Sequence, residues 1–395
     1  MSKRATVCVI GTPGRAAFAD AMLLGIHVGL CKNGVKSHLF LLERDEEAGN
    51  IQDFFTREKT DPESLFVIDI NGNYNLTPLH GRPARMRFSL LIDHPYFHAG
   101  KFASYSHPMT LGVVDATHMT ALAELGMDWP VTFLPHAGPE PEPSPRPIKD
   151  RDIDILFCGN IPPQVIGDVF EERLAALEKG HQDVVLDAIG HVLEEGRDIH
   201  SALKKAVGGK GKSLSDFSLD DLRGIITMVK SFAAGKLRLE YLAQLMALSG
   251  PAIHMVGDLE GILTKGAGVA PGPNVIFHGS LPFTEVKEMM QRTKISVNAN
   301  FTIVGGSHER IWQGMALGCL TLTNESYFMR ASFEENRNIL FFPRRSEEVA
   351  EIVSAALADP DRLQEMTEDA ARVYAAGHTW EHRVKAILDV FENTP

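Results

Sequence analysis

The sequence predicts an α/β protein of two domains, each built on a parallel sheet. At 395 residues the chain is longer than one hydrophobic core usually supports. Short apolar, β-branched runs alternate with segments of helical length, as buried parallel strands do with their crossover helices. A stretch of alternating prolines at 138–147 separates two such patterns. Because such a stretch stays extended and cannot join a sheet, residues 138–150 are predicted to be a linker.

The first half, residues 1–137, is predicted to form one open α/β sheet. A strand from Ala5 to Ile10 leads through Gly11-Thr12-Pro13-Gly14 into a helix from Arg15 to Leu30. This turn lacks the glycine spacing of a dinucleotide-binding loop, and Pro13 removes an amide that would hold a pyrophosphate. Five further strands are expected at 37–42, 65–70, 88–92, 111–114 and 131–134.

The second half, residues 151–378, begins the same pattern again with a strand at 153–158. Residues 165–248 carry helical stretches and few strand signals, and they exceed the usual crossover length, which predicts a helical insertion. Helices are expected at 347–358 and 360–391. The remaining strands are predicted at 252–256, 275–277, 295–298, 320–323 and 339–342.

Composition excludes several classes of function. A formal net charge of -12 argues against a nucleic-acid partner, which would require a surplus of Lys and Arg. The four cysteines are widely spaced, without a C-x-x-C pair, and are typical of reduced core residues. The apolar run near the amino terminus is too short for a signal peptide or a membrane span. We therefore expect a cytoplasmic protein without a transmembrane segment.

The stretch 305–323 carries the strongest functional signal. Gly305 and Gly306, with Ser307 as the cap, open a predicted helix, whose free backbone N–H groups and positive dipole end can hold phosphate oxygens. Arg310 adds a planar cation that suits a diphosphate, and Gln313 lies one turn further on, within reach of a ribose. The same residues also fit a plain capped helix in which Arg310 pairs with a carboxylate.

From His308-Glu309-Arg310 to Thr323 this stretch resembles the donor-site helix of group-1 GT-B glycosyltransferases, most closely of their CgeB-like (spore maturation protein CgeB-type) branch. The ending His378-Thr379-Trp380-Glu381-His382-Arg383 resembles the carboxyl-terminal signature of that branch. The resemblance implies two Rossmann-like domains facing each other across a cleft. It also implies a nucleotide-sugar donor held by residues 151–378, and a terminal helix, 379–395, that packs back on the first domain.

The activity implied by the resemblance is the transfer of a hexosyl or related sugar from a nucleotide-sugar to a glycan or protein acceptor. No metal and no further cofactor is expected, and bacterial surface glycans are the implied setting. Retaining members often carry two glutamates eight positions apart. Here Glu309 would pair with Leu317, and Gly305 with Gln313, so inversion and retention both stay open. Gln313 also replaces the glutamate that commonly binds the ribose.

Further donor contacts are expected where strands of the second half end, because open α/β sheets bind ligands at the carboxyl ends of their strands. Each of these residues could instead serve only as a turn. The full set of predicted donor-binding residues is Gly159, Asn160, His278, Gly279, Ser280, Asn300, Ser307, His308, Glu309, Arg310 and Gln313.

Asp93 and His94 follow the strand 88–92 and are the candidates for the catalytic base that activates an acceptor hydroxyl. A strand-end Asp-His-Pro sequence can equally be a turn. Histidines cluster between His94 and His136, but no metal site is expected. His94 and His98 have ligand spacing, yet Pro95 stands between them. The acceptor-side residues are predicted to be Gly11, Thr12, Gly14 and His136.

Two other functions fit the same sequence. A nucleotide-sugar epimerase would use the same fold and a similar phosphate-binding helix. A non-catalytic nucleotide-sugar or glycan-binding protein would explain the missing glutamate pair. The insertion at 165–248 could bind a protein acceptor or another partner, or could join two copies of the chain in a homo-oligomer.

Overall fold

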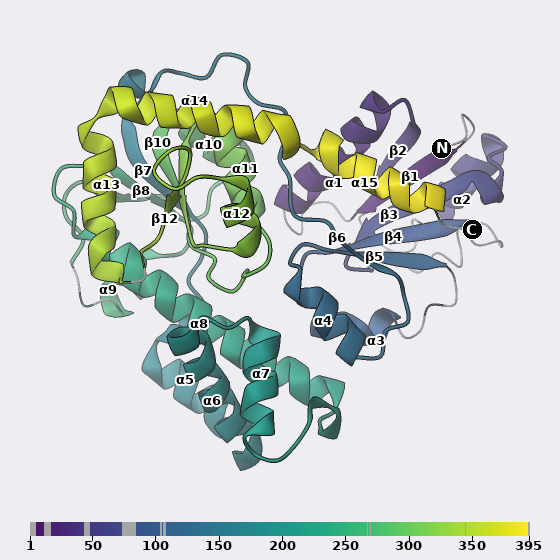
Figure 1. Cartoon of the computed structure of the whole chain (residues 1–395), viewed down its shortest axis with the longest axis horizontal. Coiled ribbons are helices and arrows are strands. Elements are labelled where there is room, and N and C mark those ends of the chain that lie inside the picture. The colour runs from purple at the N-terminus through teal and green to yellow at the C-terminus, as the bar shows by residue number, and fades with distance from the viewer. Residues whose placement is uncertain are drawn as a thin grey trace. The chain divides into compact units, whose positions relative to one another are not determined.

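The computed structural model describes residues 5–11, 17–42, 48–72, 84–102, 105, 108–266, 268, 270–343 and 345–393 (Figure 1). The chain divides into two compact units. The first unit comprises Met1–Glu140 with Ala376–Pro395, and the second comprises Pro141–Ala375. Each unit contains a six-stranded sheet in which all paired strands run parallel.

The sheet of the first unit has the strand order β2-β1-β3-β4-β5-β6. Most of its strand residues are buried because crossover helices cover parallel strands. The strands are β1 (Thr6–Gly11), β2 (Lys36–Leu41), β3 (Leu65–Ile70), β4 (Met86–Leu91), β5 (Met109–Val113) and β6 (Val131–Phe133). The helices are α1 (Ala17–Lys32), α2 (Ala48–Arg57), α3 (Ala99–Phe102), α4 (Thr117–Glu124) and α15 (Trp380–Asn393).

Helix α15 belongs to the core of the first unit, where it lies beside α1 (Figure 1). Two glycines of α1 allow this close approach. A Cβ atom on Gly25 would lie 2.2 Å from Trp380 Cδ1, and one on Gly29 would lie 3.0 Å from Val384 Cγ2. Further along α15, the ring of Phe391 lies 4.4 Å from that of Phe66 on β3. Helix α15 therefore packs in the same hydrophobic core as β1 and α1.

Gly25→Ala should destabilise the protein, because the added methyl group overlaps the indole of Trp380. Overpacking of this kind costs about 1–3 kcal/mol, more than the helix propensity that alanine adds. Gly190→Ala in α6 (Lys179–Glu195) is the matched control, because no atom lies within 4 Å of its added Cβ. Thermal unfolding should show a lower midpoint for Gly25→Ala and an equal or higher one for Gly190→Ala. Equal midpoints for both variants would contradict the close packing.

The terminal motif at 378–383 fixes the start of α15 to the segment that leaves β6. The amide of Trp380 donates to the Gly138 carbonyl at 3.0 Å, and the amide of Gly138 donates to the His378 carbonyl at 3.2 Å. Arg383 donates through Nε to the Pro135 carbonyl at 2.9 Å. Burial, with Arg383 and His382 nearby, lowers the pKa of His378 to about 4, so this residue is neutral. The motif thus has a structural role within the first unit.

The predicted single helix at 360–391 is wrong in one respect, because the chain forms two helices there. They are α14 (Pro360–Gly377) and α15, and they are separated at His378 and Thr379. The backbone groups at this break bond to Gly138 instead of to a helical turn. A contact made so far away in the sequence explains the break.

The sheet of the second unit has the order β12-β11-β10-β7-β8-β9. Its strands are β7 (Ile153–Cys158), β8 (Ile253–Val256), β9 (Val275–Phe277), β10 (Thr293–Asn298), β11 (Leu320–Thr323) and β12 (Leu340–Phe341). Its remaining helices are α5 (Gly167–Ala175), α7 (Ile199–Gly208), α8 (Leu219–Met246), α9 (Glu260–Gly266), α10 (Phe283–Gln291), α11 (Glu309–Ala316), α12 (Tyr327–Ser332) and α13 (Val349–Ala358).

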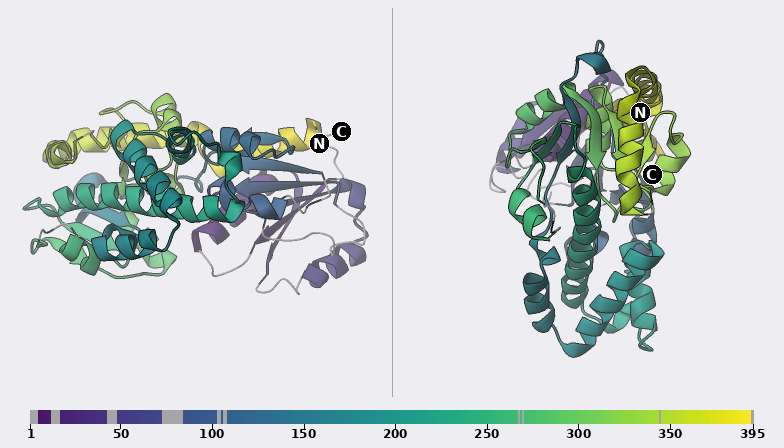
Figure 2. Two further views of the ribbon diagram at one scale, coloured as in Figure 1. Left: turned by 90° about the horizontal axis from the view of Figure 1, so that it is seen from below. Right: turned by 90° about the vertical axis from the view of Figure 1, so that its left-hand side faces the viewer.

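Helices α5, α6 and α7 and the first half of α8 form a helical bundle within the second unit (Figures 1 and 2). A capping box of Ser218 and Asp221 begins α8 in this bundle. The second half of α8 packs in the core of the sheet through Leu239, Leu242 and Leu245. The predicted insertion at 165–248 is therefore too long at its end, because the last turns of α8 belong to the crossover that leads to β8.

Hydropathy does not identify a membrane span among the helices of the described residues, since none of them is both long and apolar enough.

Candidate functional site

The carboxyl ends of β7, β8 and β9 meet through backbone groups. The amide of Gly257 donates to the Gly279 carbonyl at 2.7 Å, and the amide of Asp258 donates to Asn160 Oδ1 at 3.1 Å. Gly257 has a φ of 132°, and a Cβ atom there would lie 2.0 Å from the Gly159 carbonyl oxygen. Only glycine allows two backbone segments to approach so closely. The structure thus brings Gly159, Asn160 and Gly279 together, three of the predicted donor residues.

Arg310 in the first turn of α11 reaches the same place. A Cβ atom on Gly159 would lie 3.2 Å from Arg310 Nη1, so this glycine leaves room for the guanidinium group. Arg310 Nη1 is buried and forms no hydrogen bond with any described residue. A buried N–H donor of a cation requires an anion or another acceptor. This end of β7 therefore offers a site for a negatively charged ligand.

His308 is the N-cap of α11, not Ser307 as the sequence suggested. The ring Nδ1 of His308 lies 3.4 Å from the Arg310 amide. The ring also lies close to two charged groups: Nδ1 is 2.8 Å from Glu309 Oε2, and Nε2 is 3.2 Å from Arg310 Nη2. Ser307 is buried, and its hydroxyl accepts a hydrogen bond from Trp312 Nε1 at 3.1 Å.

Arg238 of α8 is a second arginine at this place, and sequence reasoning missed it. It is only 9% exposed, and it donates through Nε to the Ala299 carbonyl at 2.8 Å and through Nη1 to the Asn160 carbonyl. Burial, and then the charge of Arg310, lower its pKa to about 9. Its position four residues before Leu242 and seven before Leu245 places it on the buried face of a helix, so that spacing could have identified it as a buried arginine.

Gln313 and Asn300 lie on the elements that flank Arg310. Gln313 is buried on α11, one turn after Arg310. The amide of Asn300, which follows β10, donates to Asn324 Oδ1 at 3.0 Å. Asn300 also lines a small polar cavity together with Ser307 and His308. The loop between β10 and α11 thus brings Asn300, Ser307 and His308 together.

His278 lies beside a second histidine on the neighbouring strand. Its ring stacks on His254 of β8 with centroids 4.9 Å apart, and its Nε2 lies 3.0 Å from His254 Nδ1. Burial, and then His278, lower the pKa of His254. Charged groups that act on His254 include Asp152 and Arg292, which precede β7 and β10. Ser280 is exposed beyond β9, two strands from β7.

Asp93 and His94 of the first unit follow β4 and differ sharply in exposure. The Asp93 side chain is 47% exposed, and its Oδ2 accepts from Asn71 Nδ2 at 3.0 Å. His94 is only 5% exposed and stacks on Tyr96 with ring centroids 5.2 Å apart. Its ring also meets that of His118 edge-on, at 4.9 Å. The Asp93 carboxylate is therefore accessible to solvent, whereas the His94 ring is packed inside the unit.

Two of the four predicted acceptor-side residues, Gly11 and His136, lie in the part of the chain that the structure describes. Gly11 ends β1, and a Cβ atom on it would lie 2.0 Å from Leu23 Cδ1. His136 is buried, and its carbonyl oxygen lies 3.5 Å from Arg383 Nη2. Thr12 and Gly14 lie outside the described residues. Within the part of the chain that the structure describes, no group of three or more His, Cys, Asp or Glu side chains could hold a metal ion.

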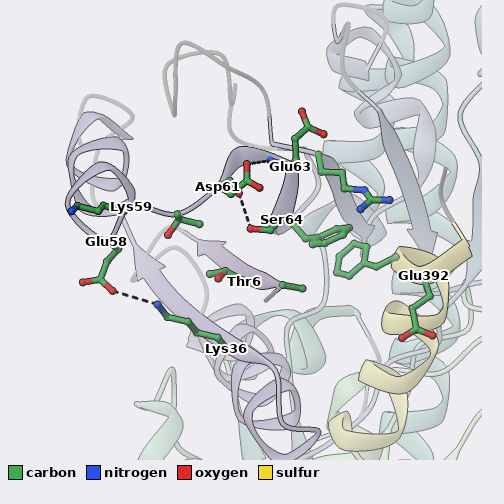
Figure 3. Close-up of a pocket in the computed structure, with 13 residues that line it drawn as sticks. Thr6, Lys36, Glu58, Lys59, Asp61, Glu63, Ser64 and Glu392 are labelled. Carbon is green, nitrogen blue, oxygen red and sulfur yellow. Dashed lines mark hydrogen bonds and ion pairs between the residues drawn. The ribbon is translucent and has the colours of Figure 1, made fainter. Parts of the chain in front are cut away.

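A pocket of about 750 Å³ in the first unit lies apart from these residues (Figure 3). Its lining includes Thr6, Lys36 and Phe66, from the amino ends of β1, β2 and β3, and Glu392 near the end of α15. Asp93 stands at the opposite, carboxyl-end edge of the sheet. Open α/β sheets bind their ligands at that edge. The pocket is therefore not part of the candidate site.

Comparison with protein families matches residues 238–389 to a family described as "Glycosyl transferase-like". The match covers less than half of the chain, and it begins at Arg238 and contains the whole of α11. No curated protein matches the chain.

Solved structures match nearly the whole chain. Sucrose-phosphate synthase from Thermosynechococcus elongatus has a TM-score of 0.55 at 9% identity, over 98% of both chains. HepE from Anabaena, in complex with UDP and glucose, has a TM-score of 0.52 at 11% identity, over 99% of this chain and 100% of its own. T4 phage BGT, in complex with its UDP-glucose substrate, has 0.52 at 10% identity, over 98% of both chains. These matches confirm the predicted fold class, an α/β protein of two Rossmann-like units with the GT-B architecture.

Proposed function

We propose that this protein is a glycosyltransferase of the CgeB-like branch that takes its sugar from a nucleoside diphosphate donor. The observation that carries the proposal is the pair of guanidinium groups, Arg238 and Arg310, at the carboxyl end of β7. Neither group hydrogen-bonds a carboxylate among the described residues. The family match and the two sequence motifs, at 308–323 and 378–383, support the same activity.

Two adjacent cations of this kind favour a diphosphate over a monovalent ligand. In the free protein the burial of Arg238 and the repulsion from Arg310 both oppose its charge, as the lowered pKa expresses. An anion between the two guanidinium groups would replace their repulsion by attraction to a shared ligand. It would also offset the cost of burying the charge of Arg238. During transfer of the sugar, negative charge develops on the leaving diphosphate, and fixed cations stabilise it. This arrangement supports transfer without a metal ion.

The other donor residues fit the remaining parts of such a ligand. Gln313, one turn beyond Arg310 on α11, is our candidate for the ribose. Gly279 and Ser280 lie two strands along the sheet from β7, roughly 10 Å at the usual strand spacing, a distance that suits the base. We propose UDP as the nucleotide because HepE and T4 phage BGT were solved with UDP or UDP-glucose.

On the first unit we propose Asp93 as the base that accepts the proton of the acceptor hydroxyl. Its exposure and its hydrogen bond from Asn71 support this role over one for His94. A glycan or protein of a bacterial surface is the proposed acceptor. A cytoplasmic location would supply the nucleotide-sugar.

A thermal-shift screen against UDP, GDP, CMP, dTDP and their common sugar conjugates tests the donor assignment. A ligand that binds only the folded state at a hundred times its dissociation constant stabilises that state by about 2.7 kcal/mol. We expect UDP and one of its sugar conjugates to raise the melting temperature, and the other nucleotides to leave it unchanged. The donor assignment would be wrong if no nucleotide stabilised the protein.

The catalytic assignment needs turnover as well as binding. We expect UDP to be released from the selected conjugate when an acceptor glycan is added. Binding without any turnover would favour a non-catalytic nucleotide-sugar-binding protein. Conversion of the donor without an acceptor would favour an epimerase of the same fold.

A further inference from the structure

The loop from residue 299 to residue 308, between β10 and α11, is bonded to the segment that follows β11. The amide of Asn300 donates to Asn324 Oδ1 at 3.0 Å, and Asn324 Nδ2 donates to the Ile303 carbonyl at 3.4 Å. Asn324 is only 9% exposed, so water has little access to these bonds. The side chain of Asn324 therefore fixes the first half of the loop.

Ser326 holds the second half of the loop. Its hydroxyl donates to the Gly306 carbonyl at 2.5 Å, and it also caps α12 by accepting from the Met329 amide at 3.1 Å. A hydroxyl group has one proton and two lone pairs, so it can form both bonds at once. The next amide, that of Tyr327, donates to the Val304 carbonyl at 2.9 Å. The start of α12 is thereby bonded to the turn that precedes α11.

The turn at Gly306 leads directly into the helix that carries Arg310. Ser307 follows Gly306, and its hydroxyl accepts from Trp312 Nε1 at 3.1 Å, which connects the loop to the buried face of α11. Arg310 stands between these two residues in the sequence, and its Nη1 lies beside Gly159. A shift of the Gly306 carbonyl would therefore be transmitted to the first turn of α11 and to the guanidinium group.

The loop and the start of α12 have almost no space between them. Ser307, Asn324 and Ser326 line the same small cavity, whose volume of about 10 Å³ is enough for no more than one water molecule. A buried carbonyl group that loses its hydrogen-bond donor is costly to leave unpaired. Without the hydroxyl of Ser326, the Gly306 carbonyl would have to move to reach another donor.

We propose that Asn324 and Ser326 are positioning residues of the donor site, which fix the loop before α11 and thereby hold Arg310 beside Gly159. This inference rests on the proposed function of the site. Both residues act through the backbone of the loop, so neither needs to touch the donor. A cation that is already held in place binds an anion more tightly, because no ordering is required when the ligand arrives.

The hold on the loop can be measured without a nucleotide, by NMR of the tryptophan indole N–H groups. The chain has three tryptophans, and Trp312→Phe identifies the Trp312 signal by its loss. We expect Ser326→Gly to shift this signal, because the indole donates to Ser307, next to the released Gly306 carbonyl. The signals of the other two tryptophans, in the first unit, should not move. An unchanged Trp312 signal would overturn the proposal.

The choice of glycine separates the bond to the loop from the capping of α12. Glycine is nearly as good an N-cap residue as serine, so Ser326→Gly costs the helix little while it removes the hydroxyl group. Ser218→Gly is the matched control, because Ser218 caps α8 in the same way by accepting from the Asp221 amide at 3.1 Å. We expect Ser218→Gly to leave all three indole signals where they are.

Calorimetric titration with UDP, well below the melting temperature of each variant, tests the effect on the donor site. Ser326→Gly and Asn324→Ala should each weaken UDP binding about fivefold, the value of one hydrogen bond. Ser326→Thr keeps the hydroxyl and should bind UDP like the wild type, as should Ser218→Gly. Wild-type affinity in both Ser326→Gly and Asn324→Ala would overturn the proposal, and if one of them does not fold the other decides.

The same titration in an Arg310→Met background shows whether Ser326 acts through the arginine. A residue that only positions Arg310 has nothing to hold there, so Ser326→Gly should cause no further loss of UDP affinity. A full fivefold loss in that background would mean that Ser326 acts on the donor by another route, against the proposal.

The two kinds of measurement fail separately. If the wild-type protein did not bind UDP, the proposed function would be wrong, and the Trp312 signal would still decide whether Ser326 holds the loop. If that signal moved in Ser326→Gly while UDP affinity stayed the same, the proposed function would stand and the positioning role would be wrong.

Discussion

Arg310→Met should lower the affinity for UDP by up to about a hundredfold. A hydrogen bond to a charged group contributes about 1.5–3 kcal/mol, and about 1.4 kcal/mol corresponds to a factor of ten. Arg310 Nη1 is buried beside Gly159 and has no other described partner, so a diphosphate would meet a donor that needs no reorganisation. Calorimetric titration with UDP measures the loss directly. An affinity within about twofold of wild type would show that the phosphates bind elsewhere.

Arg238→Met should have a comparable effect on UDP binding, with a smaller effect when Arg310 has already been replaced. The two cations lie close enough for Arg310 to lower the pKa of Arg238, and neighbouring residues of this kind are not additive. The double variant therefore measures their coupling. Full additivity would indicate that the two groups act on separate ligands.

Arg151→Met is the matched control for Arg238→Met. Arg151 is also buried, and it also donates to backbone carbonyls, those of Arg146 at 2.8 Å and Thr293 at 2.6 Å. It precedes β7, whereas Arg238 bonds the residue that follows Gly159 at the other end of that strand. We expect Arg151→Met to lower the melting temperature and to leave UDP affinity unchanged. The same pattern in Arg238→Met would reduce that residue to a structural role.

Asp93→Asn should lower kcat by about 10²- to 10⁴-fold, the usual contribution of a general base. The amide keeps the size of the side chain and can still bond to Asn71, so the fold should tolerate the change. Affinity for UDP should stay at the wild-type value, because Asp93 belongs to the unit that lacks the two arginines. Initial rates of UDP release with a saturating donor measure the effect.

His94→Phe provides the contrast with Asp93→Asn. The phenyl ring keeps the stacking on Tyr96 and the edge contact with His118, but it cannot accept a proton. We expect nearly normal turnover in this variant. If His94→Phe lost activity and Asp93→Asn retained it, the base would be His94.

The sequence predicted the strands and helix α11 well because their signals are local. Apolar runs such as 153–158 and 295–298 mark buried strands, and the glycines before α11 mark a turn. The exact cap of α11 was not predictable in the same way. Serine is a common N-cap residue and histidine is not, but Ser307 instead accepts a bond from Trp312. That contact depends on the folded path of the loop.

Arg238 and His278 show how far reasoning from the local sequence extends. Arg238 was missed because α8 begins in the helical bundle, and nothing local to its sequence says where the bundle ends and the sheet core begins. His278 was assigned to the donor site because it follows a strand. The direction of a side chain at a strand end changes with every residue, and here the ring is directed at His254. For both residues, contacts with segments far away in the sequence determine where the side chain lies.

The uninterrupted course of α8 has an evolutionary consequence. Each residue of a helix advances it by about 1.5 Å and turns it by about 100°, so one residue gained or lost before Arg238 would change its angular phase relative to the bundle. Either the arginine or the bundle would then lose its contacts. Length changes are best absorbed in the turn that follows α7, at Gly209–Lys212, where a Cβ atom on Gly211 would meet nothing within 4 Å. Homologues should therefore vary in the bundle and its turns while the spacing from Arg238 to the strand β8 stays constant.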